Sequence, residues 1–450
     1  MILDIIMKDI LGSPAILIGL FALIGLVIQK KDISDIISGT LKTVMGFVIL
    51  GAGAGVIVKS LDVFGQMFDY AFGITGVIPN NEAIVAVAQK VLGTETALIM
   101  LFGMIVNIII ARYSKFKYIF LTGHHTLFMA CLISAILSVS GITGVTLIIF
   151  GSLILGTLMV LSPAMLQNYT KEITGSDDLA LGHFGSFGYL LAAKIGKLIG
   201  DKEHSTETIN VPKKLGFLRD TSVSISLTMT LLYFVVALFA GREFIETNIS
   251  GGSNYLVFSF LQAIEFAAGV YIVLAGVRML IAEIVPAFKG IADKVVPNAR
   301  PALDCPAIFP FAPNAVIIGF LSSFVAGVIS IFVLPALGLA VIVPGLIPHF
   351  FTGATAGVYG NATGGRRGAI VGAFVNGLVI SFLPALLLPS LTAIGFEGST
   401  FGDADFGVVG LILSGAGNMS TMILYGVILA FTALPFILSI GHKKEVATEV

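Results

Sequence analysis

Four short motifs place polar or ionisable side chains within or beside apolar stretches, where such groups are costly unless they pair or face a cavity. Two of the motifs repeat a Gly-His pair, and the other two place a carboxylate close to proline. Imidazoles donate or accept hydrogen bonds near neutral pH, and carboxylates accept them from hydroxyl groups. These residue types are typical of a site for a small polyhydroxylated molecule. The motifs are Gly123-His124-His125, Gly182-His183-Phe184, Asp304-Cys305-Pro306 and Pro79-Asn80-Asn81-Glu82.

Each motif also has a structural interpretation that the sequence leaves open. His124 and His125 would cap a helix at the level of the lipid headgroups, and His183 would be a solvated loop residue. Asp304 would cap the helix that follows it, and Asn80 would belong to a turn or an N-cap. Only the spatial arrangement of these side chains can separate the two interpretations.

Other kinds of chemistry find no support in the chain. Gly51-Ala52-Gly53-Ala54-Gly55 lies inside an apolar span, with no strand before it and no Lys-Ser/Thr after it, so it does not predict a phosphate-binding loop. No metal-ligand spacing, Ser-His-Asp arrangement or redox pair appears, and Cys131 and Cys305 form no disulfide framework. The sequence predicts a non-catalytic protein without cofactor or metal.

The composition indicates a membrane protein. Of the 450 residues, 56% are hydrophobic and only 11% are charged, where a soluble domain carries roughly 25% charged residues. The mean hydropathy is +1.02, and repeated apolar runs reach the roughly 20 residues that span a bilayer. A net charge of -1 leaves no basic excess for nucleic acid.

Eleven apolar segments predict an all-α polytopic membrane protein with about eleven transmembrane helices. The first is expected to remain as a span, because its start is not the cationic start of a signal peptide. The segments run approximately over 10–29, 37–58, 97–111, 118–139, 145–165, 223–240, 255–277, 315–339, 369–388, 402–415 and 422–440.

Two stretches predict irregular backbone at membrane depth, which survives only where it lines protein or a wet cavity. Prolines bracket the residues from Ala302 to Asn314, so a regular helix is not expected there. The run from Val343 to Thr355 contains two prolines and two glycines and is expected to break a helix as a re-entrant element.

Lysine and arginine predict the orientation, because cationic loops favour the cytoplasmic side. Cations follow the first, third and fifth spans and the last span, whereas the loop from Gly241 to Asn254 carries only Arg242. The N-terminus is therefore expected outside and the C-terminus in the cytoplasm.

Internal sequence similarity predicts two membrane repeats within one transporter unit of residues 1–450. Gly39 and Pro79 stand 40 residues apart, and Gly276 and Pro313 stand 37 apart, each pair in similar surroundings. Odd numbers of spans would make the halves inverted repeats, as in many carriers. The expected division is a first repeat over 10–165, a cytoplasmic linker over 166–221, a second repeat over 222–388 and C-terminal helices over 389–450.

Six blocks together resemble the ascorbate-type membrane component, EIIC, of the bacterial phosphotransferase system, within the ascorbate/galactitol superfamily. They occur in the same order over nearly the whole chain, and the block from Asp304 to Val316 is the most specific. The blocks are Gly39 to Phe47, Leu121 to His124, Leu181 to His183, Gly276 to Glu283, Asp304 to Val316 and Pro344 to Phe351.

The resemblance implies a homodimer in the bacterial inner membrane, in contact with lipid. Each protomer would have a core domain and a V-shaped dimerisation domain, and an elevator-like motion of the core would import a sugar. Phosphorylation of the sugar would come from a cytoplasmic phosphocysteine-bearing EIIB partner, itself supplied by EIIA.

The resemblance carries His124, His183 and Asp304 over as residues of the ascorbate pocket. The surroundings depart from the family pattern: Phe128 and Phe184 stand where glutamine is usual, Ala54 where serine is usual beside Gly53, and Asn81-Glu82 where a Thr-Tyr pair is usual. Asn314 and Thr355 complete the predicted binding set. Fewer donors and an added carboxylate favour a neutral pentose or polyol over the ascorbate anion.

Two other classes of function remain open at this point. An ion-coupled secondary carrier for a neutral pentose or polyol would use Glu82, Glu265 and Glu283 as proton carriers, unless Glu265 or Glu283 pairs with Arg278. A membrane sensor or scaffold would not need Asp304 for uptake.

Overall fold

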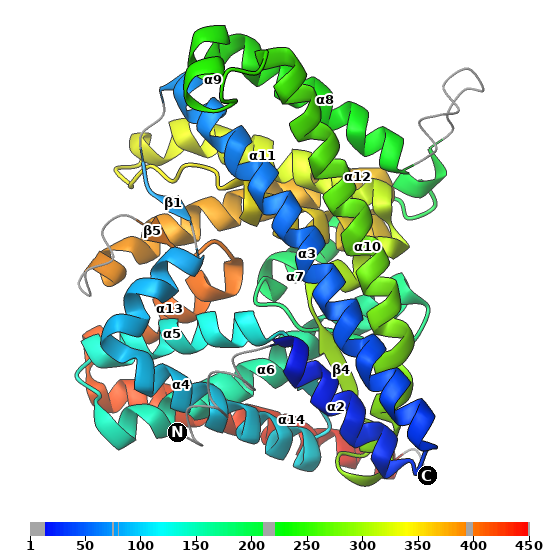
Figure 1. The fold of residues 1–450 in the computed structure, drawn as a ribbon. Helices are drawn as coiled ribbons and strands as arrows, with labels where there is room; N and C mark the ends of the chain where they lie inside the picture. The colour runs from blue at the N-terminus through cyan, green and yellow to red at the C-terminus, as the bar shows by residue number, and fades with distance from the viewer. Residues whose placement is uncertain (1–13, 74–75, 80, 210–220, 393–398, 449–450) are drawn as a thin grey trace.

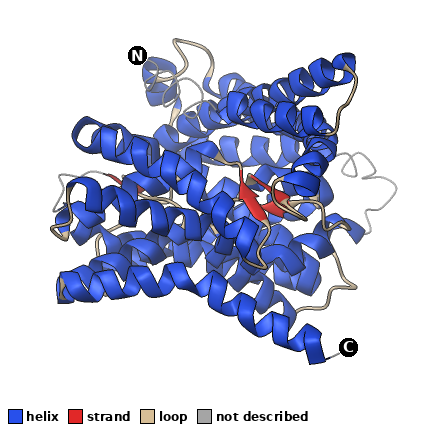
Figure 2. Ribbon diagram, turned by 90° about the horizontal axis from the view of Figure 1, so that it is seen from below, coloured by secondary structure: helices blue, strands red, loops and turns tan. Residues whose placement is uncertain are grey.

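The computed structural model describes residues 14–73, 76–79, 81–209, 221–392 and 399–448, and these residues are mainly helical (Figures 1 and 2). Asn80 and the start of the first predicted span lie outside these ranges. The helices are α2 Pro14–Ile28, α3 Ile33–Phe72, α4 Asn81–Tyr113, α5 Gly123–Val139, α6 Gly144–Thr174, α7 Ser186–Ile199, α8 Thr221–Ala240, α9 Arg242–Asn248, α10 Tyr255–Lys294, α11 Pro313–Ala336, α12 Leu346–Thr392, α13 Ala404–Met419 and α14 Thr421–Thr448.

The helices confirm the class of an all-α polytopic membrane protein. Within the described residues, seven helices are long and apolar enough to cross a membrane, or eight if the bent pair α8 and α9 forms one span. Three shorter apolar helices, Gly19–Ile28, Gly123–Val139 and Ala404–Met419, add to them. The count of eleven spans stays a prediction.

Two helices of 40 residues, α3 and α10, run side by side and form one group with α2 and α8 (Figure 1). Small residues let their backbones approach: a Cβ on Gly276 would lie 2.5 Å from the Leu50 nitrogen, and one on Gly53 would lie 2.6 Å from the Val273 nitrogen. Close packing of this kind holds helices together where lipid removes the hydrophobic driving force. The two similar sequence blocks 39–46 and 276–283 therefore contact each other across this pair.

Helices α4 to α7 and α11 to α14 form a second group, in which α12 folds back on itself as a hairpin. Gly364 and Gly365 leave helical geometry, with Gly365 at φ 55°. Asn376 donates to the Thr352 hydroxyl at 3.1 Å across the turn. In one straight helix these residues would be about 36 Å apart, at 1.5 Å per residue. The predicted break within Val343 to Thr355 is present only at its start, since Val343 to Gly345 lie outside any helix, between α11 and α12. The helix α12 begins at Leu346 and turns later, at the two glycines.

Five short strands form two parallel sheets inside the helical body (Figure 2). In the first, β4 (Arg300–Leu303) lies between β2 (Tyr118–Phe120) and β3 (Ala180–Leu181). In the second, β1 (Ile78–Pro79) pairs with β5 (Ser399–Thr400), and Val77 bridges to Ile342. Each sheet thus pairs strands from the two halves of the chain.

Short elements correct one local expectation and add detail to two others. The segment predicted to span from Tyr118 begins with β2, and its helix starts only at Gly123. The segment 166–221, predicted as a cytoplasmic linker, contains β3 and α7, and much of α7 is buried against the rest of the protein. The proline-bracketed stretch forms a short 3-10 helix, Cys305–Phe311, in place of an α-helix.

The close contact of α3 with α10 predicts a strong position dependence for alanine substitutions. Gly276→Ala or Gly53→Ala should lower the melting temperature of the detergent-purified protein, because the added methyl group meets backbone atoms of the other helix and overpacking costs about 1–3 kcal/mol. Gly55→Ala is the matched control, since no atom lies within 4 Å of its added Cβ. Equal melting temperatures for all three variants would contradict this account of the packing.

Candidate functional site

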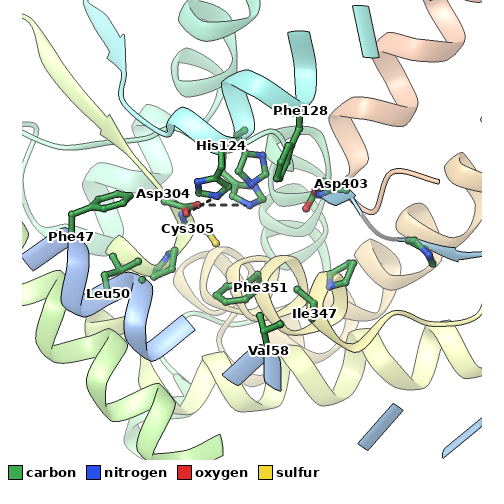
Figure 3. A pocket seen from close by; sticks show the side chains of 17 residues that line it. Phe47, Leu50, Val58, His124, Phe128, Asp304, Cys305, Ile347, Phe351 and Asp403 are labelled. Carbon is green, nitrogen blue, oxygen red and sulfur yellow. Dashed lines mark hydrogen bonds and ion pairs between the residues drawn. The ribbon is translucent and has the colours of Figure 1, made fainter. Parts of the chain in front are cut away.

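A cavity of about 250 Å³ lies between α3 and the second group of helices (Figure 3). Ligand pockets for drug-sized molecules span about 300–1,000 Å³, so this cavity suits a smaller ligand. One side is apolar and the other is polar. The apolar lining includes Phe47, Leu50, Val58, Phe128, Ile347 and Phe351, and the polar lining is Asn81, His124, His125, His183, Asp304 and Asp403.

Five of the polar side chains follow the carboxyl end of a strand. Asp304 comes directly after β4, His183 two residues after β3, and His124 four residues after β2. Asn81 and Asp403 follow β1 and β5 in the same way. Parallel strands of one sheet end at a common edge, which is a frequent position for ligand sites. The two sheets therefore direct side chains from both halves of the chain into one cavity.

Asp304 is the centre of the polar cluster. Its carboxylate accepts a hydrogen bond from the Cys305 backbone N–H at 2.7 Å. Its other contacts are with two imidazoles: Nε2 of His124 lies 3.3 Å from one oxygen, and Nε2 of His183 lies 3.8 Å from the other. The helix-cap interpretation of Asp304 is confirmed, because the residue caps the 3-10 helix. Its side chain also lines the cavity, and its role in binding stays a prediction.

A buried layer fixes the ring of His183. Its Nδ1 lies 2.8 Å from the Tyr189 hydroxyl, and its backbone carbonyl accepts from the Ser186 hydroxyl. Gly182, before it, allows β3 to approach β4, since a Cβ there would lie 2.6 Å from the Ala302 oxygen. The solvated-loop interpretation of His183 is wrong, because the side chain is 3% exposed.

Asn81 and Asp403 form the opposite polar corner of the cavity. The Asn81 amide donates to an Asp403 carboxylate oxygen at 2.7 Å, and its carbonyl oxygen accepts from the Gly402 N–H at 2.9 Å. These bonds join the residue after β1 to the residues after β5. The cavity consequently contains carboxylates from two different sheets.

An ion pair outside the membrane spans anchors the strand that ends at Asp304. Arg300, at the start of β4, donates through Nη2 to the Asp177 carboxylate at 2.5 Å. Burial alone would raise the pKa of Asp177. Hydrogen bonds from Gln167 and Arg300 and the charges of Arg300 and Lys171 together lower the pKa by more, so it lies below its ordinary value of 3.8. The pair fixes β4 at the end opposite to Asp304.

The predicted site residues divide into three groups by position. His124, His183, Asp304, Asn81 and Phe128 line the cavity. Four others are not part of the described lining. Gly53 packs on α10, Phe184 is buried against Phe120, Thr355 is buried with its hydroxyl on the Phe351 carbonyl, and Asn314 bonds Thr206 and Glu207. The side chains of Glu82 and Ala54 are outside the described set.

Several lining residues were not in the predicted set. They include the polar or ionisable His125, Cys305 and Asp403, and Gly51 in place of Gly53. The others are apolar residues and prolines: Phe47, Leu50, Val58, Pro79, Pro306, Ile347, Pro348 and Phe351. One signal for Asp403 was present in the sequence, because Gly402-Asp403 follows an extended Ser-Thr-Phe segment as Gly182-His183 follows Ala-Leu.

The charge of the cavity is negative. Its described lining holds two carboxylates and three imidazoles, and no lysine or arginine is among these residues. One atom able to bind a metal from each of His124, His125 and Asp304 lies within 4.8 Å of the other two. The same holds for His183, Asp304 and Cys305. The arrangement can accept hydrogen bonds from hydroxyl groups, and it disfavours an anionic ligand that lacks a compensating cation.

These features define a membrane protein of many spans with a ligand cavity between two groups of helices. A family model described as the PTS system sugar-specific permease component, EIIC-GAT, matches residues 9–405, and the chain belongs to this family. The chain is also similar to the ascorbate-specific PTS system EIIC component of Mycoplasma pneumoniae, with 28% identity over 80% of this chain. The match covers 63% of that relative, so the chain spans less than two thirds of its length.

The Asp177–Arg300 pair predicts a pH-dependent stability difference. Asp177→Asn should lower the melting temperature at neutral pH, because a carboxyl with a lowered folded-state pKa stabilises the fold above its unfolded pKa. The difference should shrink as pH falls below 3.8 and through the still lower folded-state pKa, where the wild-type carboxyl becomes protonated. Melting curves of both proteins across this range measure it.

Asp178→Asn is the matched control, because Asp178 is the exposed neighbour and bonds the nearby Ser176. A difference between wild type and Asp177→Asn that stays constant through the acid range would contradict the role given to the charge.

Proposed function

We propose that this permease imports a small polyhydroxylated substrate that its EIIB partner phosphorylates in the cytoplasm. The observation that supports this most directly is the position of the cavity. Its polar groups follow the strands of the second group of helices, whereas α3, from the first group, contributes only apolar side chains and Gly51 to the described lining. A ligand would therefore be held mainly by one group and covered by the other.

Substrate binding would depend on Asp304 and the imidazoles around it. The carboxylate can accept hydrogen bonds from substrate hydroxyls, and His124, whose side chain is 38% exposed, can donate or accept at the cavity surface. Asn81 and Asp403 supply acceptors at the opposite corner. Phe128 and Phe351 offer apolar surface for the carbon face of a sugar.

The charge of the cavity favours a neutral pentose or polyol over ascorbate. The departure from the family pattern at Asn81-Glu82 suggested an added carboxylate, and Asp403 supplies one at that corner independently of Glu82. A buried anion next to Asp304 and Asp403 would need a cation to offset the repulsion. Because the Mycoplasma pneumoniae relative is named as ascorbate-specific, ascorbate is the substrate with which neutral sugars should be compared.

Import would proceed by an elevator-like motion of the second group of helices against α2, α3, α8 and α10. The apolar wall of α3 is suited to such sliding, because it makes few directional bonds with the polar cluster. We also infer the inverted repeats of the sequence analysis, and the exchange of strands between the halves in both sheets supports them. The α3 and α10 group would then form the dimer contact.

Coupling to phosphorylation requires that the cavity open to the cytoplasm, where the phosphoryl group passes from the EIIB cysteine sulfur to a substrate hydroxyl. The cationic loops agree with the proposed topology. The Lys115 backbone N–H donates to the Ser439 hydroxyl at 2.8 Å, so the loop after α4 and the end of α14 lie on the same side. The positive-inside rule makes that side cytoplasmic.

An ion-coupled carrier is not favoured. Glu283 pairs with Lys42 at 3.4 Å, and Glu265 accepts from the Gln262 amide at 3.3 Å, and neither is part of the described cavity lining. Two of the three carboxylates that such a mechanism would need therefore lie away from the ligand site.

The coupling is tested by uptake of labelled substrate in cells with and without EIIB. With EIIB, the intracellular label should be phosphorylated, and without EIIB little label should accumulate. An uncoupler should leave uptake unchanged as long as the phosphoryl donor is maintained. Accumulation of free substrate in cells without EIIB would contradict the proposed coupling.

The binding role of Asp304 is tested by Asp304→Asn, which should reduce uptake by about tenfold or more, since a charge-assisted hydrogen bond contributes about 1.5–3 kcal/mol. Asp201→Asn is the matched control, because Asp201 pairs with His204 at 2.9 Å on the exposed surface. Unchanged uptake by Asp304→Asn would favour a sensor or scaffold.

Substrate class is tested by thermal shift of the purified protein. Neutral pentoses or pentitols should raise the melting temperature more than ascorbate does. If ascorbate stabilises the protein more than every neutral sugar, the charge argument from Asp304 and Asp403 is wrong, although the family assignment stands.

A further inference from the structure

We propose that the cavity also binds a divalent transition-metal cation of the Zn²⁺ type through His124, His125 and Asp304. The sequence showed no metal-ligand spacing, because the donors come from two different halves of the chain. In the structure, two ring nitrogens and a carboxylate oxygen of these residues all lie within 4.8 Å of one another. Two imidazoles and one carboxylate, with an open position, are a frequent ligand set for zinc.

Metal binding would require only a small shortening of the distances between these ligand atoms. Zinc bonds to nitrogen and oxygen of about 2.0–2.2 Å place neighbouring tetrahedral ligands about 3.3–3.6 Å apart. Nε2 of His124 already lies 3.3 Å from an Asp304 oxygen. The ring centroids of His124 and His125 are 4.8 Å apart, so the second imidazole is within reach of a side-chain rotation.

His125 provides the independent observation that points to a ligand. The side chain is buried, and within the described part of the chain its Nδ1 atom has no hydrogen-bond partner. A buried polar atom without a partner costs about 1–3 kcal/mol, so a group that supplies one is favoured. The cavity beside it is the direction from which a ligand can arrive, because His125 is part of its lining.

The electrostatics of the cavity attract a cation. Two carboxylates, Asp304 and Asp403, face a space whose described lining contains no lysine or arginine. Metal binding at histidine requires neutral imidazoles, and a cluster of rings with centroids 3.8 Å apart, such as His125 and His183, disfavours protonation of more than one ring.

A second group of donors, His183, Asp304 and Cys305, is less suited to the ion. His183 and Cys305 are both almost fully buried, whereas His124 is partly exposed and gives the first group access from the cavity. His183 would act instead as an outer partner that orients the Asp304 carboxylate, since metal-binding carboxylates usually accept such a bond.

Because the same side chains are proposed to bind the sugar, the cation and the sugar should compete. This competition rests on the proposed function, whereas metal binding itself does not. Zn²⁺ at the cavity should therefore inhibit uptake, and a chelator should restore it.

The experiment titrates Co²⁺, alone, into protein purified through a tag that contains no histidine. We expect one saturable site per protomer, visible in the d–d absorption bands of the bound ion, and displacement of Co²⁺ by Zn²⁺. His124→Ala and Asp304→Asn should each weaken binding by about tenfold or more. His204→Ala, which removes the exposed histidine of the Asp201 pair, is the matched control and should bind Co²⁺ as the wild type does.

A Cys305→Ser variant decides between the two groups of donors. It should bind Co²⁺ with unchanged affinity, and the wild-type spectrum should show no thiolate-to-cobalt charge-transfer band. A thiolate band, no saturable binding, or equal losses for His204→Ala and His124→Ala would each overturn the proposal. The cobalt titrations need neither sugar nor EIIB. Absence of metal binding would therefore not contradict the proposed transport function, and absence of uptake would not contradict metal binding.

Discussion

Backbone pairing between the two halves of the chain is the constraint on which the cavity depends. Non-helical backbone inside a membrane protein must find internal hydrogen-bond partners, because lipid supplies none. Here β4 lies between β2 and β3 in one sheet, and β1 pairs with β5 in the other. A strand of two residues cannot be stable by itself, so each sheet forms only when both halves are in place. The side chains that follow the strands, Asp304 and His183 among them, are positioned by that assembly.

Helix packing separates the cavity into a polar and an apolar side. Close approach of α3 and α10 at their glycines makes this pair a rigid wall, and the wall presents Phe47 and Leu50 to the ligand space. The polar groups are fixed on the opposite side by buried partners, as Tyr189 fixes His183. This division would let a bound ligand move with one group of helices while few directional bonds to the other group have to break.

The sequence predicted the helical class and several residues that line the cavity, because both depend on local signals. Apolar runs identify spans by length alone, and Asp304, His124 and His183 are rare polar groups in apolar surroundings. It failed where the outcome depends on pairing. Strands of two to four residues carry no usable period, so Ala180–Leu181 was taken as part of a linker. Gly53 was placed in the site although its α-carbon faces α10, because sequence alone does not determine the rotation of a helix about its axis.

Asp403 shows that the pairing of distant strands was the information missing from the sequence analysis. It lies 322 residues from Asn81, its hydrogen-bond partner, and the two meet only because β1 and β5 pair in parallel. Its presence changes the chemistry of the cavity more than any single predicted residue, since it adds a second carboxylate opposite Asp304. Two carboxylates around three imidazoles are compatible with substrate hydroxyls, which donate to them, and with a metal cation, which neutralises them. The same charge makes an unaccompanied anion the least suited ligand, so sugar selectivity and metal affinity in this protein would have one electrostatic origin.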